Sequence, residues 1–291
     1  MVGEWQTSGD KKFLSSDLEP LLRGIADYWA SRVEKDDDGK YHIKHVMCPD
    51  EYHSNVDDSV FTNWVAKFSL DAAIEAAGIL GRAPGANWRD VSQNMYIPFD
   101  ENNQYHPEFE GYAKGTKIKQ GDAILLGFPL LMNMSAKVRA NDLVNYDAIT
   151  DPNGPAMTWA MFAVGWLEAG NYAKAQSNFI RGYANVEAPF NVWTETPWGG
   201  TVNFITGAGG FLQSVLYGYG GLRVRTDRLD LTPPPPPADT DSIGLQGVNY
   251  PVVIITCVHY LGPPGPSTSQ ILGTFSRFSE TFLAERERGG P

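Results

Sequence analysis

The segment at 156–168, AMTWAMFAVGWLE, constrains the fold more than any other part of the chain. It is apolar nearly all round and spans several helical turns, so as a helix it must be surrounded by other elements. A chain of 291 residues of which 42% are hydrophobic supplies the core that such a helix needs. The length fits one main domain with a smaller additional part.

Other segments have the spacing of helices that could pack around this one. From Ser16 onward, Leu18, Leu22 and Trp29 recur at helical spacing. Ser16 and Glu19 match the capping-box pattern, in which two side chains satisfy the first backbone N–H groups of a helix. The sequence therefore predicts the first helix here.

A second helix is predicted at 63–80, with Thr62 as its N-cap and Gly81 at its end. Asn87 is placed to begin a short helix in the residues that follow it. Helical patterns continue at 140–149, at 172–186 and from 206 to about 221. The predicted fold class is therefore mainly α.

The pattern changes after residue 221. Residues 222–231 alternate as a strand does, and the prolines at 233–237 must be extended because proline lacks the backbone donor of helices and sheets. Residues 251–261 read as a buried strand, and 263–291 as a linker followed by an exposed helix. We expect a small β appendix at this end of the chain.

Charge and composition argue against several classes of function. The net charge of −11 gives no electrostatic support for nucleic-acid binding. The longest β-branched apolar run, 252–258, is far shorter than the ~20 residues that a membrane helix needs. The visible N-terminus has no secretory signal, which slightly favours a cytoplasmic location. Cys48 and Cys257 form no disulfide framework, and their pairing stays open.

Long polar loops interrupt the helical segments at 47–60, 96–122 and 188–204. Long loops in compact domains usually carry function. The first loop places Glu51 between Asp50 and the aromatic pair Tyr52 and His53, and the third places Glu195 between tryptophans.

A general acid needs a carboxyl that is partly desolvated, and aromatic rings beside a carboxylate also suit sugar binding. Trp193 is a candidate platform for a sugar ring beside Glu195. For each loop the alternative is a solvated surface turn, which composition alone favours. Two such loops in one helical protein make a carbohydrate site the better hypothesis.

Lys119 and Gln120 close the long second loop, where an ammonium and an amide could contact substrate hydroxyls; a solvated lysine is the equally weighted alternative. Among the five histidines no helical ligand pair occurs, so we expect no metal site. The glycines at 207–210 follow no strand of a βαβ unit, so they are weak candidates for a phosphate loop.

Several long blocks together resemble glycoside hydrolase family 65, the group of acid trehalases and inverting disaccharide phosphorylases. The blocks are MCPDEYHSNVDDSVFTN, YHPEFEGY, IKQGDAILLGFP, DPNGPAMTWAMFAVGWLE and VWTETPWGGTVNFITGAGGFLQ. The resemblance extends over about residues 12–226 without evident gaps, so it is more specific than any single motif.

The resemblance implies that this chain is the C-terminal part of an (α/α)6 toroid with a small β appendix. The implied domains are a partial barrel at 1–221, the start of a C-terminal β-domain at 222–262, and a linker with a flexible tail at 263–291. The chain would then begin inside the toroid, without the early helices. We therefore expect a broad apolar surface on the helix at 156–168 and on its neighbours.

By the same resemblance, Glu51 matches the general acid and Glu195 the general base of the hydrolytic branch. Lys119 and Gln120 match the pair that contacts the glucosyl unit. Independently of the resemblance, Trp193, Tyr52 and His53 are expected to contact substrate because their rings lie beside the two acids in the sequence. No cofactor is implied. One departure is Asp57 and Asp58, where relatives commonly carry asparagines; these charges could alter the pKa of the acid.

The implied reaction is inverting hydrolysis that releases glucose from an α-glucoside. The substrate that the resemblance suggests is the glucosyl-galactosyl-hydroxylysine of collagen. Acid trehalase activity is one alternative, and phosphorolysis is another, although GGTVNFITGAGG lacks the His and Ser of the phosphorylases' phosphate site. A non-catalytic carbohydrate-binding fragment is the alternative from a different class.

Overall fold

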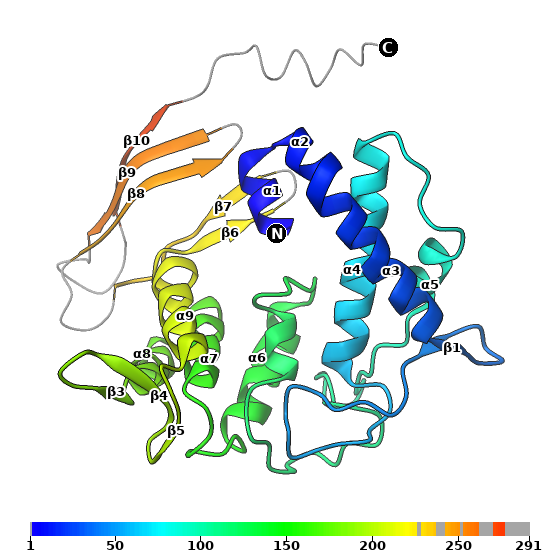
Figure 1. Ribbon diagram of the computed structural model, residues 1–291. Helices are drawn as coiled ribbons and strands as arrows, with labels where there is room; N and C mark the ends of the chain where they lie inside the picture. Colours follow the sequence, from blue (N-terminus) through cyan, green and yellow to red (C-terminus); the bar gives the residue numbers. More distant parts are fainter. Residues whose placement is uncertain (1, 226–227, 237–241, 251–252, 262–269, 277–291) are drawn as a thin grey trace. The chain divides into compact units, whose positions relative to one another are not determined.

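The computed structural model describes residues 2–225, 228–236, 242–250, 253–261 and 270–276 (Figure 1). The chain divides into two compact units. One is Leu14–Ser214, and the other combines Met1–Phe13 with Val215–Pro291. Each unit is described by itself below.

The Leu14–Ser214 unit is mainly helical. Its helices are α3 (Glu19–Arg32), α4 (Val60–Ile79), α5 (Trp88–Asn94), α6 (Ala136–Asp147), α7 (Met157–Glu168), α8 (Tyr172–Gly182) and α9 (Ile205–Gln213). A π-helical turn at Leu14–Leu18 precedes α3, and a 3-10 turn lies at Ala123–Leu126. Long loops gather at one end of these helices, at the bottom of the view in Figure 1.

The helix α7 forms the centre of this unit. Every residue from Thr158 to Leu167 is buried, which confirms the prediction from its all-round apolar sequence. The helices α6, α8 and α9 pack against it. The expectation that this helix carries a broad exposed apolar surface is therefore wrong, because elements of the same unit already cover it.

The helices α3 and α4, which correspond to the first two predicted helices, pack against each other. The residues at which they start differ from the predicted ones. The carboxylate of Glu19 accepts hydrogen bonds from Arg23 (2.7 Å) and Arg82 (2.5 Å), so the predicted capping box with Ser16 is wrong. The cap of α4 is Ser59, whose side chain accepts from the Thr62 N–H at 3.2 Å, so Thr62 is not the N-cap. Competing long-range partners explain the first difference, and a helix start three residues earlier explains the second.

The segment 188–204, predicted as a loop, forms a β-hairpin. The strands are β4 (Val192–Thr196) and β5 (Gly199–Val202), and β3 (Val186–Glu187) pairs with β4 to complete a three-stranded antiparallel sheet. The prolines and glycines of the segment mark its turn, not an irregular structure throughout. A separate two-stranded pair consists of β1 (Glu34–Lys35) and β2 (Tyr41–His42).

The second unit contains α1 (Val2–Ser8), α2 (Lys11–Phe13), β6 (Leu222–Val224), β7 (Leu229–Leu231), β8 (Ser242–Tyr250), β9 (Val253–Leu261) and β10 (Gln270–Ser276). The strands β6 and β7 form an antiparallel hairpin, and β10, β9 and β8 form an antiparallel sheet in that order.

The β appendix is thus present, with β9 covering most of the predicted strand. Residues 270–276, which the sequence places in a linker, form β10, while the predicted helix beyond 276 lies outside the described residues. The limits of the three predicted domains stay a prediction. In the described part of the chain, no helix is long and apolar enough to cross a membrane.

Candidate active site

The loop that carries Glu51 is closed at its base by backbone pairing. Val46 and Val56 exchange N–H···O bonds of 2.9 Å, and the Asp58 N–H donates to the Ile43 carbonyl at 2.8 Å. The Asp58 side chain in turn accepts from the Ile43 N–H at 3.2 Å. These bonds bring both ends of the loop together next to the start of α4, with Glu51 at the exposed tip.

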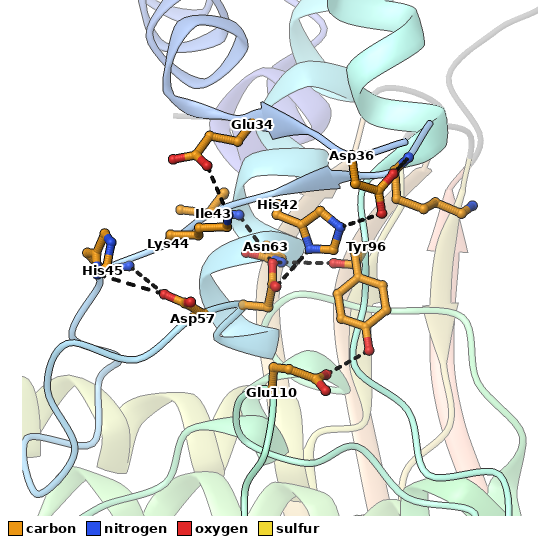
Figure 2. Close-up of polar contacts among 12 residues, drawn as sticks. Glu34, Asp36, His42, Ile43, Lys44, His45, Asp57, Asn63, Tyr96 and Glu110 are labelled. Atoms are coloured by element: carbon orange, nitrogen blue, oxygen red, sulfur yellow. Dashed lines mark hydrogen bonds and ion pairs between the residues drawn. The ribbon is translucent and has the colours of Figure 1, made fainter. Parts of the chain in front are cut away.

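His42 joins two acids at this base (Figure 2). Its Nδ1 lies 2.8 Å from Asp58 Oδ2, and its Nε2 lies 3.0 Å from Asp36 Oδ2. Burial alone lowers the pKa of His42, but the hydrogen bonds to Asp58 and Asp36 outweigh it and raise the pKa above the usual value. A charged His42 therefore stabilises the base of the loop.

The two departures from the family pattern, Asp57 and Asp58, belong to this base. The Asp57 side chain accepts from the His45 N–H at 3.0 Å, and Asn63 Nδ2 donates to Asp58 Oδ1 at 2.8 Å. Both carboxylates thus anchor the loop, and Figure 2 shows Asp57 beside His45. The expectation that they alter the pKa of Glu51 stays a prediction.

Asp50 supports the tip of the loop from inside. Its carboxylate is fully buried and accepts from the Lys119 N–H at 2.6 Å and from the Tyr52 N–H at 3.3 Å. The other carboxylate oxygen lies 2.5 Å from His53 Nδ1. Asp50 therefore connects the 49–53 turn to the segment that carries Lys119.

Glu51 itself is exposed and pairs with the ammonium group of Lys119. The hydrogen bond to Glu51 raises the pKa of Lys119, burial opposes this, and the charges of Glu51 and Glu195 raise it further. The Lys119 ammonium thus interacts electrostatically with both predicted catalytic carboxylates.

The loop that follows α6 packs against the Lys119 segment. A Cβ atom on Gly154 would lie 2.3 Å from the Lys119 carbonyl oxygen, so only glycine permits this approach. The Tyr52 hydroxyl donates to Asp151 Oδ2 at 2.6 Å, and Lys117 Nζ lies 2.8 Å from the same oxygen. These two hydrogen bonds lower the pKa of Asp151 to about 2. Tyr52 therefore ties the Glu51 turn to this loop.

Glu195 lies on β4 and is half-buried. Its backbone carbonyl accepts from the Ala156 N–H at 2.9 Å, and its side-chain Oε2 accepts from the Thr201 N–H at 3.1 Å. Gly200 has a φ of 79°, and a Cβ there would lie 3.0 Å from that same Oε2, so the turn of the hairpin is shaped around the carboxylate.

The other predicted contact residues have their own partners. Gln120 Nε2 donates to the Pro49 carbonyl at 2.5 Å. Trp193 donates to the Gly182 carbonyl at 3.0 Å, and its ring lies 5.7 Å from the ring of Phe211 on α9. Trp193 thus packs against α9. Its role in substrate binding stays a prediction, and so do the roles of Gln120, Tyr52 and His53.

Comparison with known proteins places these residues in a family. Residues 2–135 match the sequence model described as the glycosyl hydrolase family 65 central catalytic domain. A zebrafish protein named protein-glucosylgalactosylhydroxylysine glucosidase is 49% identical over 248 residues, which cover 82% of this chain and 38% of that protein. The chain belongs to glycoside hydrolase family 65.

Further relatives in the family differ in their named substrates. The protein of the same name from Dictyostelium discoideum is 44% identical over 82% of this chain and 35% of its own length. A kojibiose hydrolase from Mucilaginibacter mallensis is 37% identical over 82% of this chain and 35% of that protein. The chain thus spans well under half the length of these curated relatives.

A solved structure of a putative kojibiose phosphorylase from the human microbiome matches with a TM-score of 0.70 at 17% sequence identity, covering 94% of this chain and 48% of that one. This likeness concerns the fold alone. It confirms the predicted fold class, a mainly helical part of a family 65 toroid with a small β appendix.

Sequence reasoning missed three buried side chains below the Glu51 turn. Cys48, Glu108 and Asp122 are buried, and their possible ligand atoms all lie within 4.8 Å of one another. Asp50, His53 and Glu108 form a second such group, so these are the described residues that could hold a metal ion. Glu108 and Asp122 stand in blocks that carry the family resemblance, but acids in polar loops give no signal of burial.

Proposed function

We propose that this chain contributes both catalytic carboxylates of an inverting α-glucosidase, with Glu51 as general acid and Glu195 as general base. The observation that carries the proposal is the ion pair between Lys119 and Glu51, together with the influence of the Glu195 charge, which also raises the pKa of Lys119. The two acids come from distant parts of the sequence, and a shared cation is what a site formed from both loops would contain.

In this proposal Glu51 protonates the departing glycosidic oxygen, and Glu195 removes a proton from a water on the opposite face of the sugar. The bound glucosyl unit takes up Lys119 through its hydroxyls and separates it from Glu51. The Glu51 carboxyl is then free to carry the proton that it donates to the glycosidic oxygen.

The substrate we propose is an α-glucoside, specifically the glucosyl-galactosyl-hydroxylysine unit of collagen or its peptides. The support is the identity of 49% and 44% to two proteins named for that substrate, against 37% to a kojibiose hydrolase. Hydrolysis is favoured over phosphorolysis because the sequence carries a carboxylate, Glu195, where the resemblance expects the general base. The absence of His and Ser between Gly199 and Gly210 supports the same choice.

The test is glucose release by the purified chain and, in parallel, by the longest polypeptide that its gene encodes. We expect release from glucosyl-galactosyl-hydroxylysine to exceed release from kojibiose and trehalose, without dependence on added phosphate. Proton NMR of the first product should show β-glucose. Saturable binding of these sugars by both polypeptides, with no glucose released by either, would instead identify a carbohydrate-binding module.

A further inference from the structure

The turn that presents Glu51 rests on three buried acids. The side chains of Asp50, Glu108 and Asp122 are all 0% exposed. Among the ion pairs of the described residues, none joins these three carboxyls to a lysine or arginine. The nearby side chain that could carry a positive charge is His53, whose Nδ1 lies 2.5 Å from Asp50 Oδ2 and 3.8 Å from Glu108 Oε2. Three carboxylates so close together in a dry site repel one another strongly.

The hydrogen-bond donors in this cluster are unevenly distributed. Asp50 accepts from two backbone N–H groups and from His53, and Asp122 Oδ2 accepts from the Asp50 N–H at 3.4 Å. Neither side-chain oxygen of Glu108 has a donor, and Asp122 Oδ1 has none either. Glu108 is therefore the member of the cluster whose negative charge is least stabilised.

The groups that face Glu108 from the surrounding elements do not stabilise a negative charge on it either. Burial and the nearby carboxyls of Asp122 and Asp50 raise the pKa of Glu108 far above its usual range. Burial likewise raises the pKa of Cys48, Tyr112 and Tyr146. These three groups are neutral at physiological pH and supply no counter-charge.

The backbone fixes the place of this carboxyl. The Glu108 carbonyl accepts from the Val60 N–H at 2.9 Å, at the first residue of α4. Asp50 lies one residue before Glu51 and also holds the N–H of Lys119. A group that fixes the Asp50 side chain therefore fixes both members of the Glu51–Lys119 pair.

We propose that Glu108 is a neutral carboxyl whose single O–H donates to the buried carboxylate of Asp122, and that, because it places no negative charge beside Asp50, it is a positioning residue for Glu51. The positioning role rests on the function proposed above for Glu51, whereas the protonated state of Glu108 does not. A bound cation is the competing explanation of the cluster. It is less consistent with the hydrogen bonds that already occupy Asp50.

The test compares Glu108→Gln, which keeps a neutral donor of the same shape, with Glu108→Met, which keeps the size but removes the donor. Glu101→Gln, at an exposed acid of the same 96–122 loop, is the matched control. Infrared difference spectra at neutral pH should show the C=O stretch of a protonated carboxyl in the native protein and in Glu101→Gln, and not in Glu108→Gln. Persistence of this band in Glu108→Gln would overturn the proposal.

Hydrogen exchange at the Tyr52 and Lys119 amides measures how firmly these N–H groups are held by Asp50, and it requires no catalytic turnover. We expect protection in Glu108→Gln to match the native protein and to fall in Glu108→Met. If Glu108→Met does not fold, the native and Glu108→Gln proteins alone decide: equal protection together with loss of the band supports the proposal. Loss of protection in Glu108→Gln, or a stoichiometric metal ion in the native protein that Glu108→Gln lacks, contradicts it.

Where the native protein releases glucose, Glu108→Met should lower kcat by on the order of 10²-fold, the cost of a small misplacement of a catalytic group. KM should change little, and Glu108→Gln should restore kcat. Equal loss of kcat in both variants would overturn the neutral-donor role. If the native protein releases no glucose, the function proposed for Glu51 fails, while the infrared band and the exchange rates still decide the state of Glu108.

Discussion

The two loops that carry the candidate catalytic acids are supported in opposite ways. The Glu51 turn stands on fully buried Asp50 and is tied by side chains to the 117–120 and 151–154 segments. The Glu195 hairpin has exposed apolar residues around it, with Phe190 at 85% and Trp198 at 84% exposed.

This difference fits the two roles proposed for the acids. A general acid must meet a fixed glycosidic oxygen, so a turn locked by buried hydrogen bonds suits it. A general base acts through a water molecule, which tolerates more variation in position. The predictions below test whether the two loops differ in this way.

The largest effect is expected from Glu51→Gln. An amide cannot donate the proton that the leaving group needs, so hydrolysis of an unactivated α-glucoside should fall by about 10²–10⁴-fold. A substrate with a good leaving group needs less protonation and should lose less. Steady-state kinetics on both substrate types make the comparison. Equal losses on both would indicate that Glu51 has a structural role.

Glu195→Ala should lower turnover by about 10²-fold, the lower end of the same range. A small external anion can take the place of the base and the attacking water. Added azide should therefore restore turnover and yield a β-glucosyl azide from an α-glucoside. The carboxyls of Glu51 and Glu195 should be roughly 6.5–9.5 Å apart to admit water. Product NMR that shows α-glucose first would contradict inversion.

Asp50→Asn should destabilise the protein by about 1.5–3 kcal/mol, the usual value of a hydrogen bond to a charged group. The reason is that one amide oxygen cannot satisfy the donors from Lys119, Tyr52 and His53 at once. Denaturant titration measures the change. An unchanged free energy of unfolding would show that the Glu51 turn is no better supported than the hairpin.

A smaller, pH-dependent effect is expected at the base of the Glu51 loop. The raised pKa of His42 means that its contribution to stability is fully present below about pH 6.5, the usual unfolded value, and is lost as pH rises through the folded pKa. Thermal unfolding across this window should reveal the loss. His42→Gln should remove it, whereas exposed His45→Gln should leave it in place.

Trp198→Ala should have the smallest effect on stability, within about 0.5 kcal/mol, because the ring is almost entirely exposed. If the exposed hairpin forms part of the sugar site, the same change should raise KM for the α-glucoside. Thermal unfolding and kinetics of one preparation give both values. A large loss of stability would mean that Trp198 is packed, and the contrast between the loops would fail.

The sequence determined the helical core and the location of the chemistry. The all-round apolar pattern at 156–168 predicted a buried helix because no other arrangement removes so much apolar surface from water, and α7 is that helix. Blocks around Glu51, Lys119 and Glu195 predicted the family through long runs of matching residues. The hairpin at 192–202 escaped prediction because the prolines and glycines of its turn hid the strand alternation.

Only the tertiary structure decided which polar groups are buried and what they contact. Sequence patterns report periodicity along one element, whereas Asp50 comes from the 47–60 loop and Glu108 and Asp122 from separate parts of the 96–122 loop. The same limit explains Glu19, which binds arginines instead of capping its helix, and Trp193, which packs against α9. Desolvation and long-range hydrogen bonding depend on neighbours from elsewhere in the chain, and only folding brings those neighbours together.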